Sequence, residues 1–306
     1  MEWPKNKKFA FTIIDDTDNA TVENVKPVYD LLYKLGIYTT KSIWVYPPRN
    51  SFRGQSLNDK EYLDFIRELK SRGFDIALHN VGSGEFTRTE IQEGLECFSE
   101  KTGSYPYVQI NHSSNPDNLY WGNERFVFPL NKLMKLIFGK KRQFYGTDKE
   151  SQFFWGDLAK KYMKFIRNHC FNGINTISRD YKMPYKVRAK EEYSNYWFSS
   201  SDGQTVEEFC ALLSFDNIDL LEKQRGACIV YTHFASGFAS NGKLNENFVE
   251  RMNYLARKDG WFVPAGVLLG YLLDMRRNHY AGYPYLLRLD LLWLFDRIIK
   301  KIKFKR

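Results

Sequence analysis

The feature that most constrains the fold is a regular alternation of strand-like and helix-like segments. Apolar and β-branched runs typical of buried strands occupy 9–14, 39–46, 74–81, 105–114, 173–180, 195–202, 227–236 and 261–267. Segments with helical spacing of apolar residues lie between them, at 25–36, 59–73, 87–103, 156–170, 206–213, 246–260 and 268–277. Repeated βα units without a Gly/Ser-rich linker predict an α/β chain with a closed or nearly closed parallel barrel over 1–282.

The last segment, 283–306, stands apart as a basic amphipathic helix. One predicted face carries apolar side chains and the other carries charged ones: Leu287, Leu291, Leu294, Phe295, Ile298 and Ile302 against Asp296, Arg297, Lys300 and Lys303. Such a helix could make peripheral contact with an anionic membrane through 286–306, or it could pack on the barrel. The charge pattern alone leaves both possibilities open.

Charge and composition limit where the protein is expected to be located and what it is expected to bind. The net charge is +9, but 296–306 alone holds six basic residues and one acid, so no basic groove for nucleic acid is expected across the barrel. No signal peptide or membrane span is apparent. The four cysteines are widely spaced without a CxxC pair, which favours a reduced, cytoplasmic protein, peripheral at most to the inner face of the membrane.

Polar residues that suit catalysis follow several of the predicted strands. Asp15 and Asp16 end the first strand, and similar positions are taken by His79, His112, Asp202 and His233. Functional groups of a parallel barrel gather at the C-terminal ends of its strands. Three of the five histidines terminate strands, so a shared site is favoured over three unrelated core histidines. Asp18, Asn19 and Thr21 are interpreted mainly as the cap of the following helix.

One aspartate and two neutral imidazoles form a ligand set that leaves positions open on a divalent cation, as a catalytic metal site requires. Asp16 would be the carboxylate ligand. Asp15, pointing into the cavity, could take a proton from water, and His233 could protonate a departing amine or alkoxide. Two imidazoles and a carboxylate suit Zn²⁺, our first choice, but also Fe²⁺, Co²⁺ and Mn²⁺.

Three motifs resemble those of the NodB-homology polysaccharide deacetylases, the family-four carbohydrate esterases: "TIIDD" at 12–16, "LHNVGS" at 78–83 and "YTH" at 231–233. The resemblance implies a distorted (β/α)7 barrel that removes acetyl from N-acetylated sugars with a divalent metal. It implies that Asp15 is the general base, Asp16 and His79 are metal ligands, and His233 is the general acid. The stretches "NYWFSSSDG" and "CIVYTHFASGF" resemble a branch linked to bacterial surface-polysaccharide biosynthesis.

The chain also departs from that pattern. The family's second motif has another metal histidine where this sequence has Ser83, so His112 is expected to be the third ligand. The arginine motif that orients the base has no clear counterpart. Asp202 is expected to bind substrate or orient His233, and sugar-stacking roles are assigned to three tryptophans that could equally be core residues: Trp121, Trp155 and Trp197.

The first hypothesis is therefore a metal-dependent hydrolase that releases acetate from an N-acetylated sugar or glycan. A second is a non-catalytic, deacetylase-like protein that binds glycan or acts as a scaffold, which the serine at position 83 would suit. A third is a haloacid-dehalogenase-like phosphatase with Asp16 as its nucleophile and Asp18 as its acid, because "IIDDTD" also fits a strand-DxD pattern.

Overall fold

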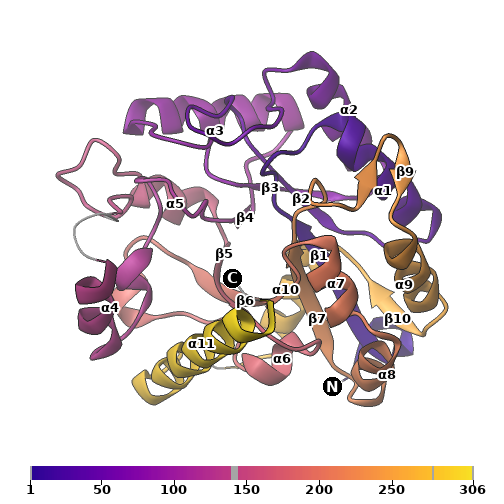
Figure 1. Cartoon of the computed structure of the whole chain (residues 1–306). Coiled ribbons are helices and arrows are strands. Elements are labelled where there is room, and N and C mark those ends of the chain that lie inside the picture. Colours follow the sequence, from indigo (N-terminus) through magenta and orange to yellow (C-terminus); the bar gives the residue numbers. More distant parts are fainter. Residues whose placement is uncertain (1, 139–143, 278, 305–306) are drawn as a thin grey trace.

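The structure, a computed structural model that describes residues 2–138, 144–277 and 279–304, contains a closed barrel of seven parallel strands (Figure 1). Following the ring, they are β1 (Phe9–Asp15), β2 (Thr40–Ile43), β3 (Asp75–Leu78), β4 (Val108–Gln109), β5 (Phe165–Phe171), β6 (Tyr196–Asp202) and β7 (Ala227–Thr232). Pairing of β1 with β7 closes the ring. The α/β barrel expected from the alternating pattern is confirmed.

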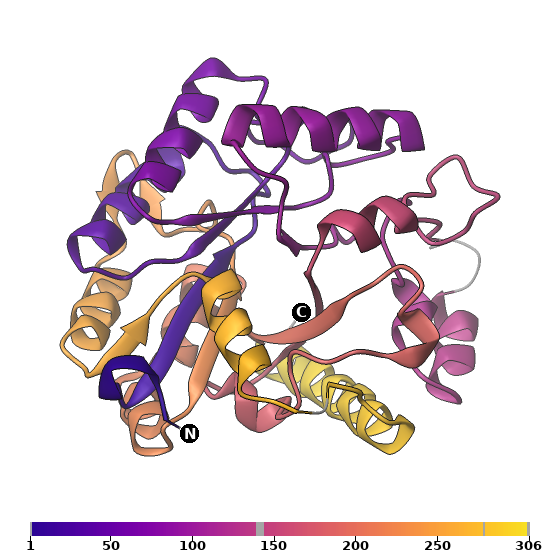
Figure 2. The same cartoon turned by 180° about the vertical axis from the view of Figure 1, so that it is seen from behind.

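Helices surround the barrel (Figures 1 and 2). Their bounds are α1 (Val22–Lys34), α2 (Lys60–Ser71), α3 (Arg88–Thr102), α4 (Leu130–Phe138), α5 (Gly156–Tyr162), α6 (Thr176–Arg179), α7 (Val206–Leu212), α8 (Phe215–Lys223), α9 (Glu246–Ala256), α10 (Ala265–Asp274) and α11 (Tyr283–Phe304). A small hairpin, β8 (Ala239–Ser240) and β9 (Lys243–Leu244), lies outside the barrel sheet. Thr21 caps α1 through the backbone N–H of Asn24, as its sequence position predicts.

The ring is distorted where β1 meets β2. An eighth strand, β10 (Gly260–Phe262), pairs with the first three residues of β1. Only Ile14 and Asp15 remain to pair with β2, whereas the other edge of β1 pairs with β7 over six positions. The end of β1 is thus paired mainly with β7 and only briefly with β2.

Two element predictions in the second half are wrong. Residues 156–170, predicted as one helix, form α5 and then most of β5, where aromatic and β-branched side chains favour a buried strand. Residues 173–180, predicted as a strand, contain the short helix α6. The strand expected at 105–114 shrinks to the two residues of β4, and its remainder is a polar loop.

The C-terminal helix α11 packs on the barrel through polar side chains. Asp290 accepts from the backbone N–H of Val127 at 2.8 Å and lies 3.0 Å from Nε2 of His169. Farther along, Arg297 and Lys300 reach the buried carboxylate of Asp202 at 2.5 and 3.0 Å. The packing alternative named for this segment therefore holds for its inner face. No helix among the described residues is long and apolar enough to span a membrane.

Asp202→Asn should destabilise the protein by about 3 kcal/mol, because Arg297 loses its carboxylate partner in a buried cluster, although Lys300 keeps Glu208. Burial raises the pKa of Asp202, but Arg297 and Lys300 outweigh burial and lower it. The stabilisation is therefore present above the ordinary pKa of an aspartate and is lost as the pH falls through the lowered value. Urea unfolding at neutral and acid pH measures both effects.

The matched control is Asp64→Asn, whose partner Lys60 is 88% exposed. Such a surface pair contributes little, so unfolding should change by no more than about 0.5 kcal/mol. Equal, small effects of the two substitutions would contradict the anchoring role of Asp202.

A candidate metal centre at the mouth of the barrel

The two adjacent aspartates at the end of β1 point to opposite sides of the barrel wall. Successive side chains of an extended strand alternate between its faces. The ladder continues through Asp16, whose N–H donates to the carbonyl of Thr232 at 2.9 Å. Asp16 therefore faces the cavity and Asp15 faces the surrounding layer.

Asp15 is fully buried in an ion pair with Lys41 of β2, at 3.0 Å. It also accepts hydrogen bonds from the Tyr29 hydroxyl, at 3.0 Å, and from the backbone N–H of Phe234, at 2.8 Å. Burial raises the pKa of Asp15 in spite of Lys41. The sequence-based assignment of Asp15 as a base pointing into the cavity does not agree with this geometry, because its oxygens are committed to the core.

Asp16 forms a two-pronged ion pair with Arg167 of β5. Guanidinium Nη1 and Nη2 donate to Oδ1 and Oδ2 at 3.0 and 2.6 Å. Burial would lower the pKa of Arg167, but the charge of Asp16 outweighs it and the pKa is raised. Both carboxylate oxygens are thus held by the arginine, and Asp16 does not belong to the group of possible metal ligands for which the sequence proposed it.

The carboxylate that meets the histidines is Asp18. Its Oδ1 lies 3.2 Å from Nε2 of His79 and 3.4 Å from Nε2 of His112, and its Oδ2 lies 3.3 Å from Nε2 of His233. The ligand atoms of Asp18, His79 and His112 all lie within 4.8 Å of one another. The structure thus brings together both predicted histidine ligands, with Asp18 in place of Asp16.

Amide side chains orient the imidazoles. Asn80, in the left-handed region at φ 51°, accepts from the His112 backbone N–H at 2.8 Å and so joins the loops after β3 and β4. Nδ1 of His112 lies 3.0 Å from Oδ1 of Asn115. An amide oxygen only accepts, so Nδ1 is the donor and Nε2 presents its lone pair to the site. His233 is turned in the same way, with Nδ1 at 3.3 Å from the carbonyl of Gln204.

The charges of the cluster reinforce one another. Burial would raise the pKa of Asp18, but the three surrounding histidines, with Nε2 atoms 3.2–3.4 Å from its oxygens, hold it well below its usual range. Burial lowers the pKa of His79 and favours the neutral imidazole that binds metal. For His233, burial would lower the pKa, yet Asp18 outweighs it and the pKa is raised.

The donor set fits a divalent cation. Several buried polar atoms face one another without a hydrogen bond, namely Oδ1 of Asp18, Nε2 of His79 and Nε2 of His112. Buried polar atoms are costly unless partnered, and a cation would satisfy all three at once. Two imidazole nitrogens and one carboxylate oxygen suit a catalytic ion with open positions.

The cluster opens into a cavity of about 290 Å³. Asp16, Asp18, His79 and His233 line it, and Trp121 and Trp293 contribute aromatic surface. A neighbouring cavity of about 330 Å³ shares both tryptophans. The site therefore has room for a substrate beyond the reacting group, and α11 supplies part of its wall through Trp293.

Other predicted site residues lie elsewhere. Asp202 lines a different cavity and is neutralised by α11, so it is not placed to orient His233. Trp155 is 1% exposed and donates to the carbonyl of Asp117, and Trp197 is 2% exposed, so both are core residues. Trp121 alone of the three lines the cavity. Ser83 is buried and bonded to Asn50.

Three residues of the site were missed by the sequence reasoning. Asp18 was assigned to capping because it precedes α1, and Arg167 was hidden by the helix predicted over 156–170. The aromatic and β-branched neighbours of Arg167 in "FIRNHCF" were the available signal for a strand. Trp293 had no local signal, because only the docking of α11 brings it to the cavity.

The structure is thus a (β/α)7 barrel with a candidate metal site at the strand ends. A structure from Mycobacterium smegmatis, named as a candidate polysaccharide deacetylase, superposes with a TM-score of 0.54 at 11% identity, covering 93% of this chain and 97% of that one. Two weaker overlaps are a Bacillus subtilis peptidoglycan deacetylase (TM-score 0.40, 10% identity, 89% and 94% covered) and a Clostridium thermocellum family 4 acetyl xylan esterase with cobalt (0.39, 10%, 90% and 100%).

The similarity of this chain to these solved structures is thus a similarity of fold. No family model matches the sequence, and no curated protein matches it.

His79→Ala, His112→Ala or Asp18→Asn should each lower the affinity for Zn²⁺ or Co²⁺ at least about 10-fold, because each removes one of the three candidate ligands. Asp16→Asn should leave binding within a few-fold, since its carboxylate belongs to Arg167. Metal content after dialysis against limiting metal is the measurement, and His279→Ala is the control. Loss of metal in Asp16→Asn with retention in Asp18→Asn would reverse the assignment.

Proposed function

We propose that the protein is a metal-dependent hydrolase that removes acetyl from an N-acetylated sugar or glycan. The observation that carries this proposal is the meeting of Asp16, Asp18, His79 and His233 around one cavity. A ligand group, a separate carboxylate and a separate imidazole are the parts that amide hydrolysis needs. The fold shared with a candidate polysaccharide deacetylase supports the substrate class.

Asp18, His79 and His112 would hold the cation. When bound, a divalent ion supplies Lewis acidity, which polarises a carbonyl oxygen and makes water a better nucleophile. We propose Zn²⁺ for this position, since a set of two imidazoles and one carboxylate is common for catalytic zinc.

Asp16 is the proposed general base, in the role that the sequence assigned to Asp15. Its carboxylate faces the cavity, and Arg167 fixes it in orientation through both oxygens. Each carboxylate oxygen has a second lone pair besides the one that accepts from Arg167, so Asp16 can accept a proton from the attacking water. Arg167 then fills the base-orienting role for which the sequence offered no candidate.

His233 is the proposed general acid. It lies on the loop after β7, and its Nε2 faces the cavity because Nδ1 is directed to the carbonyl of Gln204. In its protonated form this imidazole can give its proton to the departing amine as acetate forms. Base and acid thus come from the ends of neighbouring strands, β1 and β7.

Sugar binding is assigned to Trp121, with Trp293 opposite in place of Trp155. Aromatic faces suit the apolar faces of sugar rings, and both indoles line the cavity. We further propose a role in surface-polysaccharide biosynthesis and a cytoplasmic location. The family resemblance of the motifs supports the first, and four free cysteines are in keeping with the second.

The two alternatives fit the site less well. A pure glycan-binding scaffold needs neither an oriented carboxylate nor an imidazole beside a ligand group, yet Asp16 and His233 are both in place. A phosphatase with Asp16 as its nucleophile would leave the clustered His79 and His233 without a role. Its proposed acid, Asp18, lies among the three histidines instead.

The test is acetate release from N-acetylated oligosaccharides by the metal-loaded protein. Asp16→Asn and His233→Ala should each lower kcat about 10²–10⁴-fold while retaining the metal, because each removes one proton-transfer step. His279→Ala should behave as the parent. Metal binding by a parent that releases no acetate would favour the scaffold, and phosphate release dependent on Asp16 would favour the phosphatase.

A further inference from the structure

The outer face of α11 is apolar and uncovered. Its exposed positions recur at helical spacing, and the side chains are between 52 and 75% exposed: Leu291, Phe295, Ile298 and Ile302. Isolated exposed apolar residues are ordinary on a protein surface, but a stripe along three turns of one helix marks an interaction surface.

The charges around this stripe have one sign. The acidic residues of α11, Asp290 and Asp296, are buried against the barrel. Arg288 and Lys301 are exposed. The sequence goes on with Lys303, Lys305 and Arg306. Since the acids are used inward, the outward side of the helix offers only apolar and cationic groups.

The neighbouring helix α4 has the same character (Figures 1 and 2). The two helices share a small core whose members are Phe126, Leu130, Met134, Leu287, Trp293 and Leu294. On α4, Leu133 is 48% and Leu136 is 82% exposed. Lys132 and Lys135 are exposed beside them. No acid occurs in the sequence between Arg125 and Thr147.

We propose that these two outer faces, the α4–α11 surface, bind the anionic face of a lipid bilayer. The surface consists of Lys132, Leu133, Lys135, Leu136, Leu291, Phe295, Ile298, Lys301 and Ile302. Interfacial helices bury an apolar face between lipid headgroups and add attraction between lysines and anionic lipid. Trp293 of α11 lines the catalytic cavity, so binding brings that cavity to within about 10 Å, one helix diameter, of the bilayer.

Co-sedimentation of the full chain with vesicles tests this surface. The parent should bind phosphatidylglycerol-containing vesicles and not pure phosphatidylcholine, and binding should weaken as salt rises. A triple substitution, Phe295→Ser, Ile298→Ser and Ile302→Ser, should abolish binding. Lys132→Glu with Lys301→Glu should weaken it by roughly fivefold or more for each lysine.

The matched control replaces exposed apolar residues elsewhere, Leu220→Ser and Val267→Ser on α8 and α10, and should bind as the parent. Circular dichroism checks that every variant is folded. Unchanged vesicle binding by the triple variant overturns the proposal. The proposal is also overturned if the parent forms a concentration-dependent dimer and the triple substitution abolishes it, because a second copy of the chain would then occupy the α4–α11 surface.

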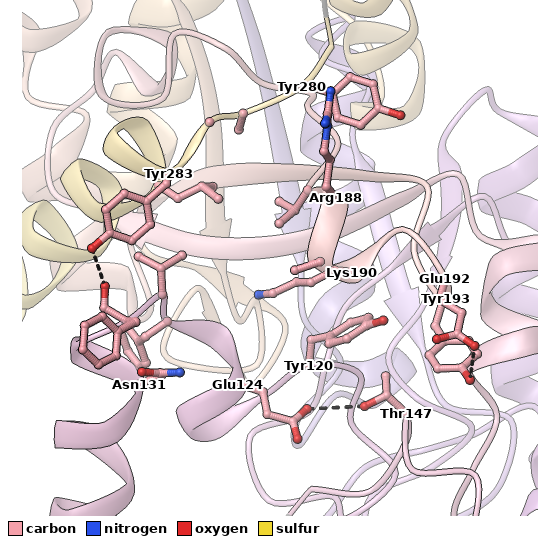
Figure 3. Close-up of a pocket in the computed structure, with 18 of the residues that line it drawn as sticks. Tyr120, Glu124, Asn131, Thr147, Arg188, Lys190, Glu192, Tyr193, Tyr280 and Tyr283 are labelled. Atoms are coloured by element: carbon pink, nitrogen blue, oxygen red, sulfur yellow. Dashed lines mark hydrogen bonds between the residues drawn. The ribbon is translucent and has the colours of Figure 1, made fainter.

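A second, independent observation is a groove of about 1030 Å³ away from the metal site (Figure 3). Tyrosine rings line it, from Tyr120, Tyr193, Tyr280 and Tyr283. Charges of both signs lie between them, from Glu124, Glu192, Arg188 and Lys190. The loop around η2 (Gly122–Arg125) separates the two spaces, with Trp121 and Arg125 on the catalytic side and Asn123 and Glu124 on the groove side.

The geometry points to a glycan in this groove, bound through sugar units other than the reacting one. Sugars combine apolar ring faces, which suit tyrosine, with hydroxyls that bond to both acids and bases. Glu124, Glu192 and Lys190 already have protein partners, and their remaining hydrogen-bonding positions can meet sugar hydroxyls, whereas a strongly charged ligand would meet both signs. This inference rests on the proposed function, because it extends that substrate from one sugar to a chain.

Calorimetry on the metal-free full chain tests the groove without turnover, using an N-acetylhexosamine tetrasaccharide and its monosaccharide. Tyr280→Ala with Tyr283→Ala should weaken tetrasaccharide binding by about tenfold or more and leave the monosaccharide unaffected. Tyr33→Ala with Tyr181→Ala, exposed tyrosines elsewhere, is the control. Equal tetrasaccharide binding by the variant and the parent overturns the proposal that this groove binds glycan. If the tetrasaccharide affinity falls as expected in the tyrosine variant while the metal-loaded parent releases no acetate, the glycan-binding role of the groove is supported and the deacetylase proposal fails.

Discussion

The end of β1 depends on two buried ion pairs that point in opposite directions. Asp15 meets Lys41 in the layer outside the barrel, and Asp16 meets Arg167 inside it. A buried carboxylate without a cation would be strongly destabilising, so each aspartate requires its own partner. The outer pair also fixes geometry, because Asp15 receives the N–H of Phe234, next to His233. Asp15 thereby holds the loop that carries the proposed acid, His233, while Asp16 faces the cavity.

The sequence predicted the barrel and three strand-end histidines because both follow from local patterns. Strand and helix periods differ, and a polar residue directly after an apolar run lies at the rim whatever the rest of the chain does. The roles of Asp15 and Asp16 could not be predicted in this way. A shift of one residue in strand phase exchanges the two faces, and the apolar run before them is buried on both sides. Asp18 lies in a loop without a period, and Arg167 lay in a segment whose strand was interpreted as helix.

Position 83, where the resembled family has a histidine, is a serine here, and the third candidate ligand comes from a different loop. His112 comes from the chain after β4, and a network of amides brings it to His79: Asn80 holds its backbone and Asn115 holds its Nδ1. Asn115 is itself fixed by donating to the carbonyl of Gly82 at 2.7 Å. The segment 80–83 therefore positions the candidate ligand His112. Such outer contacts set ring orientation and tautomer, and so decide which nitrogen can bind a metal.

Helix α11 joins the chemistry of the barrel to the outer surface of the molecule. Consecutive helix positions are about 100° apart, so Trp293 and Phe295 lie on opposite sides of one turn. The first lines the cavity beside the candidate metal site and the second is 60% exposed. The ion pairs of Asp202 with Arg297 and Lys300 fix the rotation of the helix about its axis. Trp293 is therefore held toward the cavity while Phe295 is held on the outer side. A helix held only by apolar contacts could rotate and bury its outward stripe, whereas buried charges with fixed partners make that rotation costly.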